Sequence, residues 1–450
     1  MTAKPPGPRL RTAIALFTRD LRVHDNPALD LAFRSAEHVI PLFVVHDGLG
    51  FAVPNRVRFL HDCLADLRAA LRERGGDLVI RRGDPVTEVL RLAGEAGADG
   101  VILARDVSAY ARRRWQRLEE GCARARIALR GADSVTVVPP GAVTPAGGDH
   151  FKVFTPYWRA WSGHEWRPGV HPPATISLPP GIAPGPLPGA AAMGADGASG
   201  QLPPGGESAA RGRMEAWLAG GLARYAERHD DLPGDATSRL SADLHFGCLS
   251  PLELAVRAGK AGGEGGDAYV RQLCWRDFHA QVASAFGDLA RRDYRPRRDD
   301  WREDPGALAA WKAGQTGYPV VDAGMRQLAA EGFMHNRARL LVASFLTKQL
   351  NIHWTAGARH FFDLLVDGDI ANNGGNWQWV AGTGNDTRPG RRFSLRRQAE
   401  RFDPGGEYVR RYVPELAGVP GGEVHAPWRL ARPPKGYPPP LIDPDGEGPR

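Results

Sequence analysis

The sequence predicts an N-terminal α/β domain with a doubly wound parallel sheet, a long linker and an all-helical C-terminal domain. Short apolar runs alternate with amphipathic stretches over the first 140 residues, and helical periodicity dominates after residue 209. Between them, nineteen of the 41 residues at 168–208 are Pro or Gly, a composition too poor in apolar bulk to fold alone. We expect the α/β domain at 12–140, the linker at 141–208, the helical domain at 209–428 and a Pro-rich tail at 429–450.

The α/β prediction rests on apolar runs without polar alternation, which are typical of parallel strands buried on both faces. Such sheets bind ligands beyond the carboxyl ends of their strands. The segment "TRDLRVHDN" follows the first run in place of GxGxxG, which argues against a dinucleotide fingerprint. The expected strands are 13–17, 39–45, 78–80, 101–103 and 134–138, with helices from about 26, at 53–74, after 84 and, rich in Arg, after 103.

The region after residue 209 contains few β-branched runs, and its apolar residues recur at helical spacing. We find no internal repeat. The expected helices are 217–229, 252–259, 269–286, 307–312, 323–332 and 337–349.

Composition limits the class of protein. No apolar run approaches the roughly 18 residues that a membrane span needs. The four cysteines lack metal-ligand spacing, so we expect reduced thiols, no metal and a cytoplasmic protein.

Lys and Arg total 58 against 51 Asp and Glu, a net charge of +7, and only six of the 58 are Lys. Arg suits phosphate contacts and indicates a polyanionic partner, although GC-rich coding explains the same bias equally well.

Two polar segments of the helical region stand out. Thr237–Ser241 bunches hydroxyls near a helix entry, an arrangement that suits phosphate binding but more often serves as helix caps. The segment "DGDIANNGGNWQW" at 367–379 is unlike an ordinary core helix. It predicts polar groups facing a buried heteroaromatic ligand, because a surface loop would not explain its two Trp residues.

Seven of the twelve Trp residues fall between Trp217 and Trp379. Trp301, Trp354 and Trp377 fit ordinary core packing. They would instead relay electrons if a redox centre lay beside them.

A series of motifs then resembles a known family. "ALFTRDLRVHDNPAL", "FTPYWRAW", "TSRLSADLHFGCLSP", "QLCWRDFH", "TGYPVVDAGMRQL", "MHNRARL", "SFLTKQL" and "DGDIANNGGNWQW" occur in this order. Together they resemble the DNA photolyase/cryptochrome family, most closely the microbial class I photolyases that split cyclobutane pyrimidine dimers. The resemblance runs from about Thr12 to Trp428 and leaves the linker unmatched.

The resemblance implies a U-shaped FAD deep in the helical domain, working as FADH−. Asp367 would pair with Arg339, and Asn373 would face flavin N5, where an amide bonds either protonation state. The implied cofactor-binding residues are Tyr225, Thr237, Ser238, Arg239, Leu240, Ser241, Arg276, Arg339, Asp367, Gly368, Asp369 and Asn373.

The resemblance also implies light-driven repair: excited FADH− gives an electron to the dimer, the ring opens and the electron returns. The partner would be damaged double- or single-stranded DNA, bound by a monomer, with the lesion flipped into an aromatic pocket. The implied catalytic residues are Gln272, Trp275, Asn336, Asn373, Trp301, Trp354 and Trp377. The implied DNA-binding residues are Gln272, Trp275, Arg276, Asn336, Arg337, Gln378 and Trp379.

Three departures from the family pattern bear on the alternatives. Gln272 stands where dimer-splitting members mostly carry Glu, and Gln also occurs there in six-four photolyases. However, His335-Asn336-Arg337 replaces the paired histidines of those enzymes. Leu340 replaces a common Met, and Phe393-Ser394-Leu395 replaces an Asn-Pro turn, which puts local stability in doubt. A six-four photolyase and a cryptochrome-type photoreceptor remain the alternatives.

The family's α/β domain holds an antenna pigment. Arg56 and Asp106 resemble the pocket of members that bind 8-hydroxy-5-deazaflavin. The Asn-Glu signature for methenyltetrahydrofolate is absent, since Val107-Ser108-Ala109 stands there. The deazaflavin is therefore the expected antenna, methenyltetrahydrofolate is less favoured, and an empty pocket is the remaining alternative.

Overall fold

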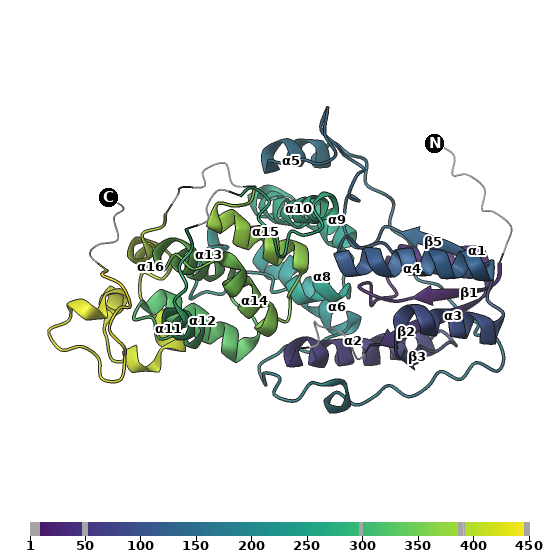
Figure 1. Cartoon of the computed structure of the whole chain (residues 1–450), viewed down its shortest axis with the longest axis horizontal. Coiled ribbons are helices and arrows are strands. Elements are labelled where there is room, and N and C mark those ends of the chain that lie inside the picture. The colour runs from purple at the N-terminus through teal and green to yellow at the C-terminus, as the bar shows by residue number, and fades with distance from the viewer. Residues whose placement is uncertain (1–9, 47–52, 297–299, 386–389, 391, 445–450) are drawn as a thin grey trace.

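The computed structural model describes residues 10–46, 53–296, 300–385, 390 and 392–444. It shows an α/β domain beside an all-helical region, with the chain passing between them through a long irregular segment (Figure 1). The predicted fold class is confirmed. The last six residues of the expected tail lie outside the described residues.

The sheet has five parallel strands in the order β3-β2-β1-β4-β5. Because the order reverses between β1 and β4, a crevice opens at the carboxyl ends of these two strands. Residues that follow β1 and β4 therefore meet there. The strands are β1 (Leu10–Leu16), β2 (Ala36–Val45), β3 (Val79–Arg82), β4 (Gly100–Ala104) and β5 (Ala128–Ala132).

Helices cover both faces of the sheet. Along β1, Ala13 and Ala15 belong to one apolar cluster, and Ile14 and Leu16 to another on the opposite face. The first cluster includes α1 and α2 and the second includes α3 and α4, so the sheet is doubly wound. These helices are α1 (Pro27–Ser35), α2 (Pro54–Arg72), α3 (Pro85–Ala96) and α4 (Ala109–Ala125).

The fifth strand was predicted wrongly. It is formed by Ala128–Ala132, which pairs with β4, and not by 134–138. The apolar run at 134–138 turns instead toward the helical region, where the backbone N–H groups of Val137 and Val138 donate to Asp277. Its hydrophobicity therefore reflects burial between domains.

The helical region contains more helices than the periodicity indicated. Those described are α6 (Glu207–Ala216), α7 (Tyr225–Arg228), α8 (Ser241–Phe246), α9 (Pro251–Ala261), α10 (Gly263–Ala285), α11 (Pro305–Ala313), α12 (Pro319–Glu331), α13 (Asn336–Ser344), α14 (Trp354–Leu364), α15 (Ile370–Ala381), α16 (Leu395–Phe402) and α17 (Glu407–Tyr412). The helix expected at 217–229 is broken by a π-helical turn and a 3-10 turn before α7. No helix in the described part of the chain is both long and apolar enough to cross a bilayer.

The segment that looked least helical forms α15. Asp369 caps it, its Oδ1 accepting from the backbone N–H of Asn372 at 2.8 Å. Ser394, in the unusual Phe393-Ser394-Leu395 segment, caps α16 in the same way through the N–H of Arg397. Ser394 thus caps this helix at the position where the family pattern has Asn-Pro.

The expected linker is irregular but fixed in place. Its N-terminal part contains α5 (Phe154–Ser162). Further on, Ile176 N donates to Arg74 O at 2.7 Å, and the carbonyl of Pro184 accepts from Ile80 N of β3 at 2.7 Å. The segment therefore follows the α/β domain closely (Figure 1).

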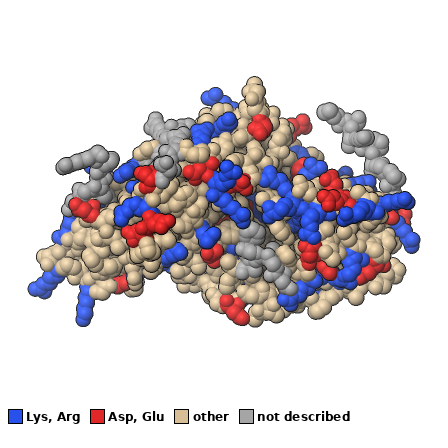
Figure 2. Space-filling model, viewed as in Figure 1, with Lys and Arg blue, Asp and Glu red and all other residues tan. Residues whose placement is uncertain are grey.

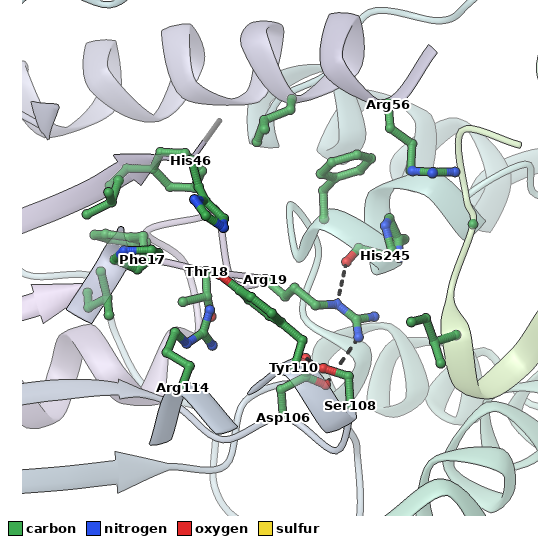
Figure 3. Close-up of a pocket in the computed structure, with 18 of the residues that line it drawn as sticks. Phe17, Thr18, Arg19, His46, Arg56, Asp106, Ser108, Tyr110, Arg114 and His245 are labelled. Atoms are coloured by element: carbon green, nitrogen blue, oxygen red, sulfur yellow. Dashed lines mark hydrogen bonds and ion pairs between the residues drawn. The ribbon is translucent and has the colours of Figure 1, made fainter. Parts of the chain in front are cut away.

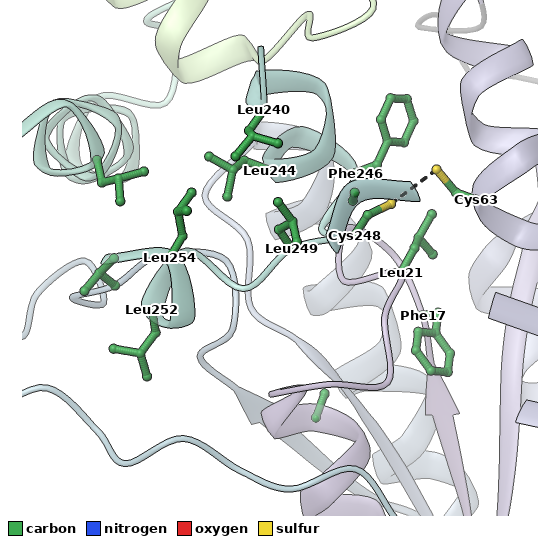
Figure 4. Packing of buried hydrophobic residues seen from close by; sticks show 14 of the residues in the cluster. Phe17, Leu21, Cys63, Leu240, Leu244, Phe246, Cys248, Leu249, Leu252 and Leu254 are labelled. Carbon is green, nitrogen blue, oxygen red and sulfur yellow. Dashed lines mark hydrogen bonds between the residues drawn. The ribbon is translucent and has the colours of Figure 1, made fainter. Parts of the chain in front are cut away.

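The two domains share one hydrophobic core. Phe59 of α2 packs on Phe246 with ring centroids 5.0 Å apart, and Cys63 of α2 lies 3.3 Å from Cys248, sulfur to sulfur (Figure 4). All four cysteines are buried free thiols. Gly247 adopts φ +72°, and a Cβ there would overlap the backbone of Arg19, so the contact between the domains requires glycine.

Asp277 on α10 binds three segments together. Its Oδ2 accepts from Val137 N at 2.9 Å, from Val138 N at 3.0 Å and from Trp161 Nε1 of α5 at 3.0 Å. Burial raises the pKa of this carboxyl to about 6, and the Arg276 guanidinium 3.7 Å away opposes the rise. The buried carboxylate thus joins the α/β domain and α5 to the helical region.

We predict that Asp277→Ala lowers the free energy of unfolding by about 4 kcal/mol, because three buried donors lose their acceptor. Asp277→Asn retains one acceptor oxygen and should cost about half as much, roughly 2 kcal/mol. Chemical denaturation of both variants at neutral pH measures the difference. Equal stability of Asp277→Ala and the parent would contradict the role of this carboxylate.

Candidate active site

A cavity of about 440 Å³ in the helical region is lined by residues of two hydrophobic clusters, the core that the two domains share and a second core within the helical region. Its walls come from α10, α13, α14 and α15 and from the chain around the start of α8. Its volume falls in the range of small-molecule and cofactor sites, about 300–1,000 Å³. Buried polar groups lie at its inner end and exposed or half-buried groups at its mouth.

The cavity brings most of the predicted site residues together. Those lining it are Tyr225, Ser238, Leu240, Ser241, Gln272, Trp275, Arg276, Asn336, Arg339, Asp367, Asp369, Asn373, Trp377 and Trp379. Predicted residues outside the lining are Thr237, Arg239, Arg337, Gly368, Trp301, Trp354 and Gln378.

Asp367 provides an acceptor at the inner end. Its Oδ2 accepts from Arg339 Nη2 at 2.9 Å, which is the ion pair expected from the sequence. Its Oδ1 is buried and has no hydrogen-bond partner among the residues that the structure describes. An uncompensated buried acceptor is costly, so this oxygen fits a donor N–H of a bound heteroaromatic ring.

Asp369 stands two residues further on and remains ionised. Burial by itself would raise its pKa, but Arg19, His245 and Arg276 outweigh that effect and hold the pKa well below its usual range. Arg19 Nη2 donates to Asp369 Oδ2 at 2.6 Å. The carboxylate therefore keeps its charge at any physiological pH.

Asn373 lies one turn into α15, on the same face as Asp369. Its Nδ2 donates to Ala358 O of α14 at 2.9 Å, so its amide oxygen is the group left to face a ligand. His279 on α10, whose ring packs against Gly375 of α15, has its pKa lowered by burial to about 4 and is neutral. This wall thus offers acceptors and a neutral ring.

Only part of the segment predicted to bind phosphate lines the cavity. Ser238 lines the cavity, and its Oγ accepts from Tyr269 OH at 2.9 Å. Arg239 adopts φ +51° and turns its side chain away to Glu331 Oε2, 2.9 Å distant. The backbone conformation at Arg239 thus separates a cavity-lining hydroxyl from an outward-facing guanidinium.

The mouth carries aromatic and amide groups. Gln272 and Asn336 are exposed, and Trp275 and Trp379 are half-buried. Trp275 stacks on Phe154 of α5 with centroids 3.7 Å apart and planes 3° apart. Because Phe154 supports one face of the indole, the ring is held rigidly beside the opening.

Three predicted DNA contacts need correction. Arg337 pairs with Asp230, and its guanidinium lies 4.3 Å above the ring of Phe402. Gln378 is 0% exposed and uses its amide on Tyr294 N and on two backbone carbonyls. Arg276 donates to backbone carbonyls of both domains, so it forms cavity wall and does not reach outward.

The three Trp residues occupy different depths. Trp377 lines the cavity, and its ring packs where a Cβ on Gly357 of α14 would lie. Trp354, at the start of α14, is fully buried and donates through Nε1 to Asp293 Oδ1 at 2.7 Å. His353 lies between Trp354 and the half-buried Trp301, with ring centroids 5.7 and 5.0 Å away.

A second cavity, of about 210 Å³, opens at the carboxyl ends of β1 and β4 (Figure 3). Arg56, Asp106 and Gly368 line it. Burial lowers the pKa of Arg56 to about 10, and its guanidinium lies 4.2 Å from the Phe362 ring centroid. The two residues expected at an antenna pocket therefore face one cavity between the domains.

Sequence reasoning missed several groups of the site. Arg19, His245, His279 and Tyr269 were not selected, although each contacts or lines the main cavity or its carboxylates. Arg19 stands inside "TRDLRVHDN", the polar segment after β1, which was the available signal. Within the described part of the chain no group of His, Cys, Asp and Glu is arranged for a metal ion.

Several known proteins are similar to this chain. Residues 13–177 match the family described as DNA photolyase, and 269–448 match the FAD binding domain of DNA photolyase. A deoxyribodipyrimidine photo-lyase of Streptomyces griseus is 53% identical over 96% of this chain and 97% of its own. A cryptochrome DASH of Natronomonas pharaonis is 37% identical over 96% of this chain and 98% of its own. The crystal structure of a bacterial class III photolyase from Agrobacterium tumefaciens matches with a TM-score of 0.90 and 31% identity, over 98% of this chain and 96% of that one.

We predict that Gly375→Ala on α15 lowers the free energy of unfolding by about 2 kcal/mol, because the added methyl overlaps the His279 ring in the cavity wall. Gly212→Ala on α6 is the matched control, since its Cβ meets nothing within 4 Å. That change should be neutral or stabilising by up to about 1 kcal/mol. Thermal unfolding of both variants tests the difference, and similar effects would contradict the tight packing at Gly375.

Proposed function

Because the chain belongs to the DNA photolyase and cryptochrome family, we propose that it repairs cyclobutane pyrimidine dimers in DNA under light, with FAD as its cofactor. One observation supports this most strongly. A single cavity leads from an aromatic mouth at Trp275 and Trp379 to the acceptors Asp367, Asp369 and Asn373. A flipped lesion at the mouth would therefore lie close to a flavin at the inner end.

The inner residues fit FAD. Bound in this cavity, FAD would supply the light-driven electron transfer that opens the cyclobutane ring. The residues of the chain would bind and orient the cofactor. Asp367 Oδ1 can accept a hydrogen bond from it, Asp369 remains negatively charged, and the amide oxygen of Asn373 can also accept. Tyr225, Leu240 and the Ser238 and Ser241 hydroxyls line the remaining wall, beside the start of α8.

The mouth fits an extrahelical lesion. Bases taken out of the stack bind to aromatic faces, and Trp275 offers one face while Phe154 supports the other. Gln272 and Asn336 are exposed amides that can donate to base carbonyls. Asn336 begins α13 and Gln272 lies on α10, so the two amides reach the opening from different helices.

Basic residues suit the DNA backbone. Figure 2 shows Lys and Arg side chains gathered over α4. The chain carries a net charge of +7. Binding to phosphates releases counterions, so affinity for DNA should fall as salt rises.

His335 argues against the six-four alternative. It is 1% exposed, its Nδ1 accepts from Arg337 N at 3.2 Å, and burial lowers its pKa to about 4. A buried neutral helix cap does not provide the acid that six-four repair is expected to need. A cryptochrome-type photoreceptor remains the second candidate, because a cryptochrome DASH is similar over nearly its whole length.

The second cavity suits an antenna pigment. Apolar side chains such as Phe43 and Leu60 line it together with Arg56, Arg114 and Asp106, a set that fits a planar anionic ring with a hydroxyl group. We favour 8-hydroxy-5-deazaflavin over methenyltetrahydrofolate.

A monomeric state, a cytoplasmic location and domain boundaries at 140, 208 and 428 remain predictions from the sequence.

The first test is repair itself. The FAD-loaded, chemically reduced protein should remove dimers from a duplex oligonucleotide under blue light and not in the dark, as followed by recovery of thymine absorbance. Gln272→Glu should raise the dimers split per absorbed photon, because a carboxyl group can share a proton with the reduced dimer. Gln315→Glu, an exposed change after α11, is the matched control and should behave as the parent.

DNA binding without dimer loss in the light would favour the photoreceptor instead. A lower repair yield in Gln272→Glu would contradict the role given to position 272 while leaving the repair function standing.

The second test concerns the Trp row. Trp377→Phe and Trp301→Phe should strongly slow photoreduction of oxidised FAD by an external thiol, because electron tunnelling falls steeply with distance. Chemically reduced variants should repair at close to the parental yield. Trp115→Phe in the α/β domain is the control. If both Trp377→Phe and Trp301→Phe are photoreduced at the parental rate, these tryptophans serve core packing alone.

A further inference from the structure

We propose that Arg19 of the α/β domain is a positioning residue of the flavin cavity, one that fixes Asp369 and balances its charge. This inference rests on the proposed function, because it concerns the cavity assigned to FAD. It gives the α/β domain a part in the cofactor site besides carrying an antenna.

Arg19 lies where the sheet and the helical region meet. It follows β1 at the crevice beside β4, and its guanidinium has three hydrogen-bond partners, two of which, His245 and Asp106, are drawn in Figure 3. Nε donates to His245 O at 3.1 Å, Nη1 to Asp106 Oδ1 at 3.2 Å and Nη2 to Asp369 Oδ2 at 2.6 Å. The side chain therefore spans from the second cavity, lined by Asp106, to the main cavity, lined by Asp369.

Both oxygens of Asp369 are held. Oδ2 accepts from Arg19, and Oδ1 accepts from the backbone N–H and the side-chain Nδ2 of Asn372 at 2.8 and 2.7 Å. The Asp369 side chain is 12% exposed. With both oxygens bonded in a buried setting, the carboxylate has a single orientation at the cavity wall.

The other charged groups nearby do not replace Arg19. His245 Nδ1 is 3.9 Å from Asp369 Oδ2, and burial lowers the pKa of this imidazole, so it is neutral at physiological pH. Arg276 uses its guanidinium on the carbonyls of Val135 and Leu244. Arg339 is paired with Asp367. Among the described residues, Arg19 is the cation hydrogen-bonded to Asp369.

This charge balance should set the reduction potential of the bound flavin. Reduction to FADH− adds a negative charge to the ring system, and nearby charges act strongly in a buried site. An Asp369 carboxylate without Arg19 would disfavour the reduced form and lower the potential. An Arg19 guanidinium without Asp369 would favour the reduced form and raise it.

The test measures the reduction potential of bound FAD by dye-equilibrated titration at mildly alkaline pH, together with FAD retention after gel filtration. Arg19→Met should lower the potential and weaken retention of reduced FAD more than of oxidised FAD. Asp369→Asn should raise the potential, since Asn still caps α15. The double variant should return close to the parental value.

Arg105→Met is the matched control. Arg105 is exposed and lines a polar space that Arg19 and Asp369 also line, but it packs on Trp115 and should not move the potential. If Arg19→Met does not fold, Arg19→Lys and Asp369→Asn are compared instead. Arg19→Lys keeps the charge, so its reduction potential should stay near that of the parent, whereas Asp369→Asn should have a higher potential.

Unchanged potentials in Arg19→Met or in Asp369→Asn, with FAD bound, would overturn the inference and leave the proposed function intact. A double variant that shifts as far as Arg19→Met alone would also overturn it, because it would show that Arg19 does not act through Asp369. A parent that fails to bind FAD would instead refute the proposed function.

Discussion

Two buried carboxylates at the start of α15 impose the central constraint on this structure. Asp367 and Asp369 stand two residues apart beside a cavity between two hydrophobic clusters, and each needs a cation to remain charged there. Arg339 supplies one from α13, within the helical region, and Arg19 supplies the other from the α/β domain. Because those cations approach from different domains, the carboxylates can both be satisfied only when the domains are docked. The glycine at 247, the shared core around Phe59 and the three-way contact of Asp277 all serve that docking.

The sequence predicted the sheet well because burial on both faces leaves a local signal, a continuous apolar run. It failed at the fifth strand for the same reason. Ala128–Ala132 is a half-exposed edge strand with Arg130 in its middle, whereas the more apolar run after it is buried between domains. Hydrophobicity reports burial and not the type of partner. The segment at 367–379 was misleading in the opposite way, because its polar composition looked unlike a core helix. Most of it forms the regular helix α15, and the polar residues line a cavity from one face of that helix.

Site residues were predictable where the side chain faces the cavity from a distinctive motif, as Asp367, Asn373 and Trp275 do. Arg337 and Gln378 share such motifs, yet their side chains turn to partners that no local pattern discloses: Asp230 lies 107 residues away from Arg337, and Leu289 lies 89 away from Gln378. Arg19 was missed for a related reason. Its partner Asp369 is 350 residues distant, so its role becomes visible only after the domains are assembled.

The irregular linker also affects how the sheet meets neighbouring molecules. β3 is an edge strand, and an open edge offers N–H groups to any extended chain that approaches, the first step of strand-mediated aggregation. Here the N–H of Ile80 is taken by Pro184, and Gly185 lets the linker come so close that a Cβ would press on the Ile80 carbonyl. Proline has no N–H with which to extend the ladder further. The Pro- and Gly-rich linker therefore covers the exposed edge of β3, and its prolines provide no N–H groups with which a further strand could pair.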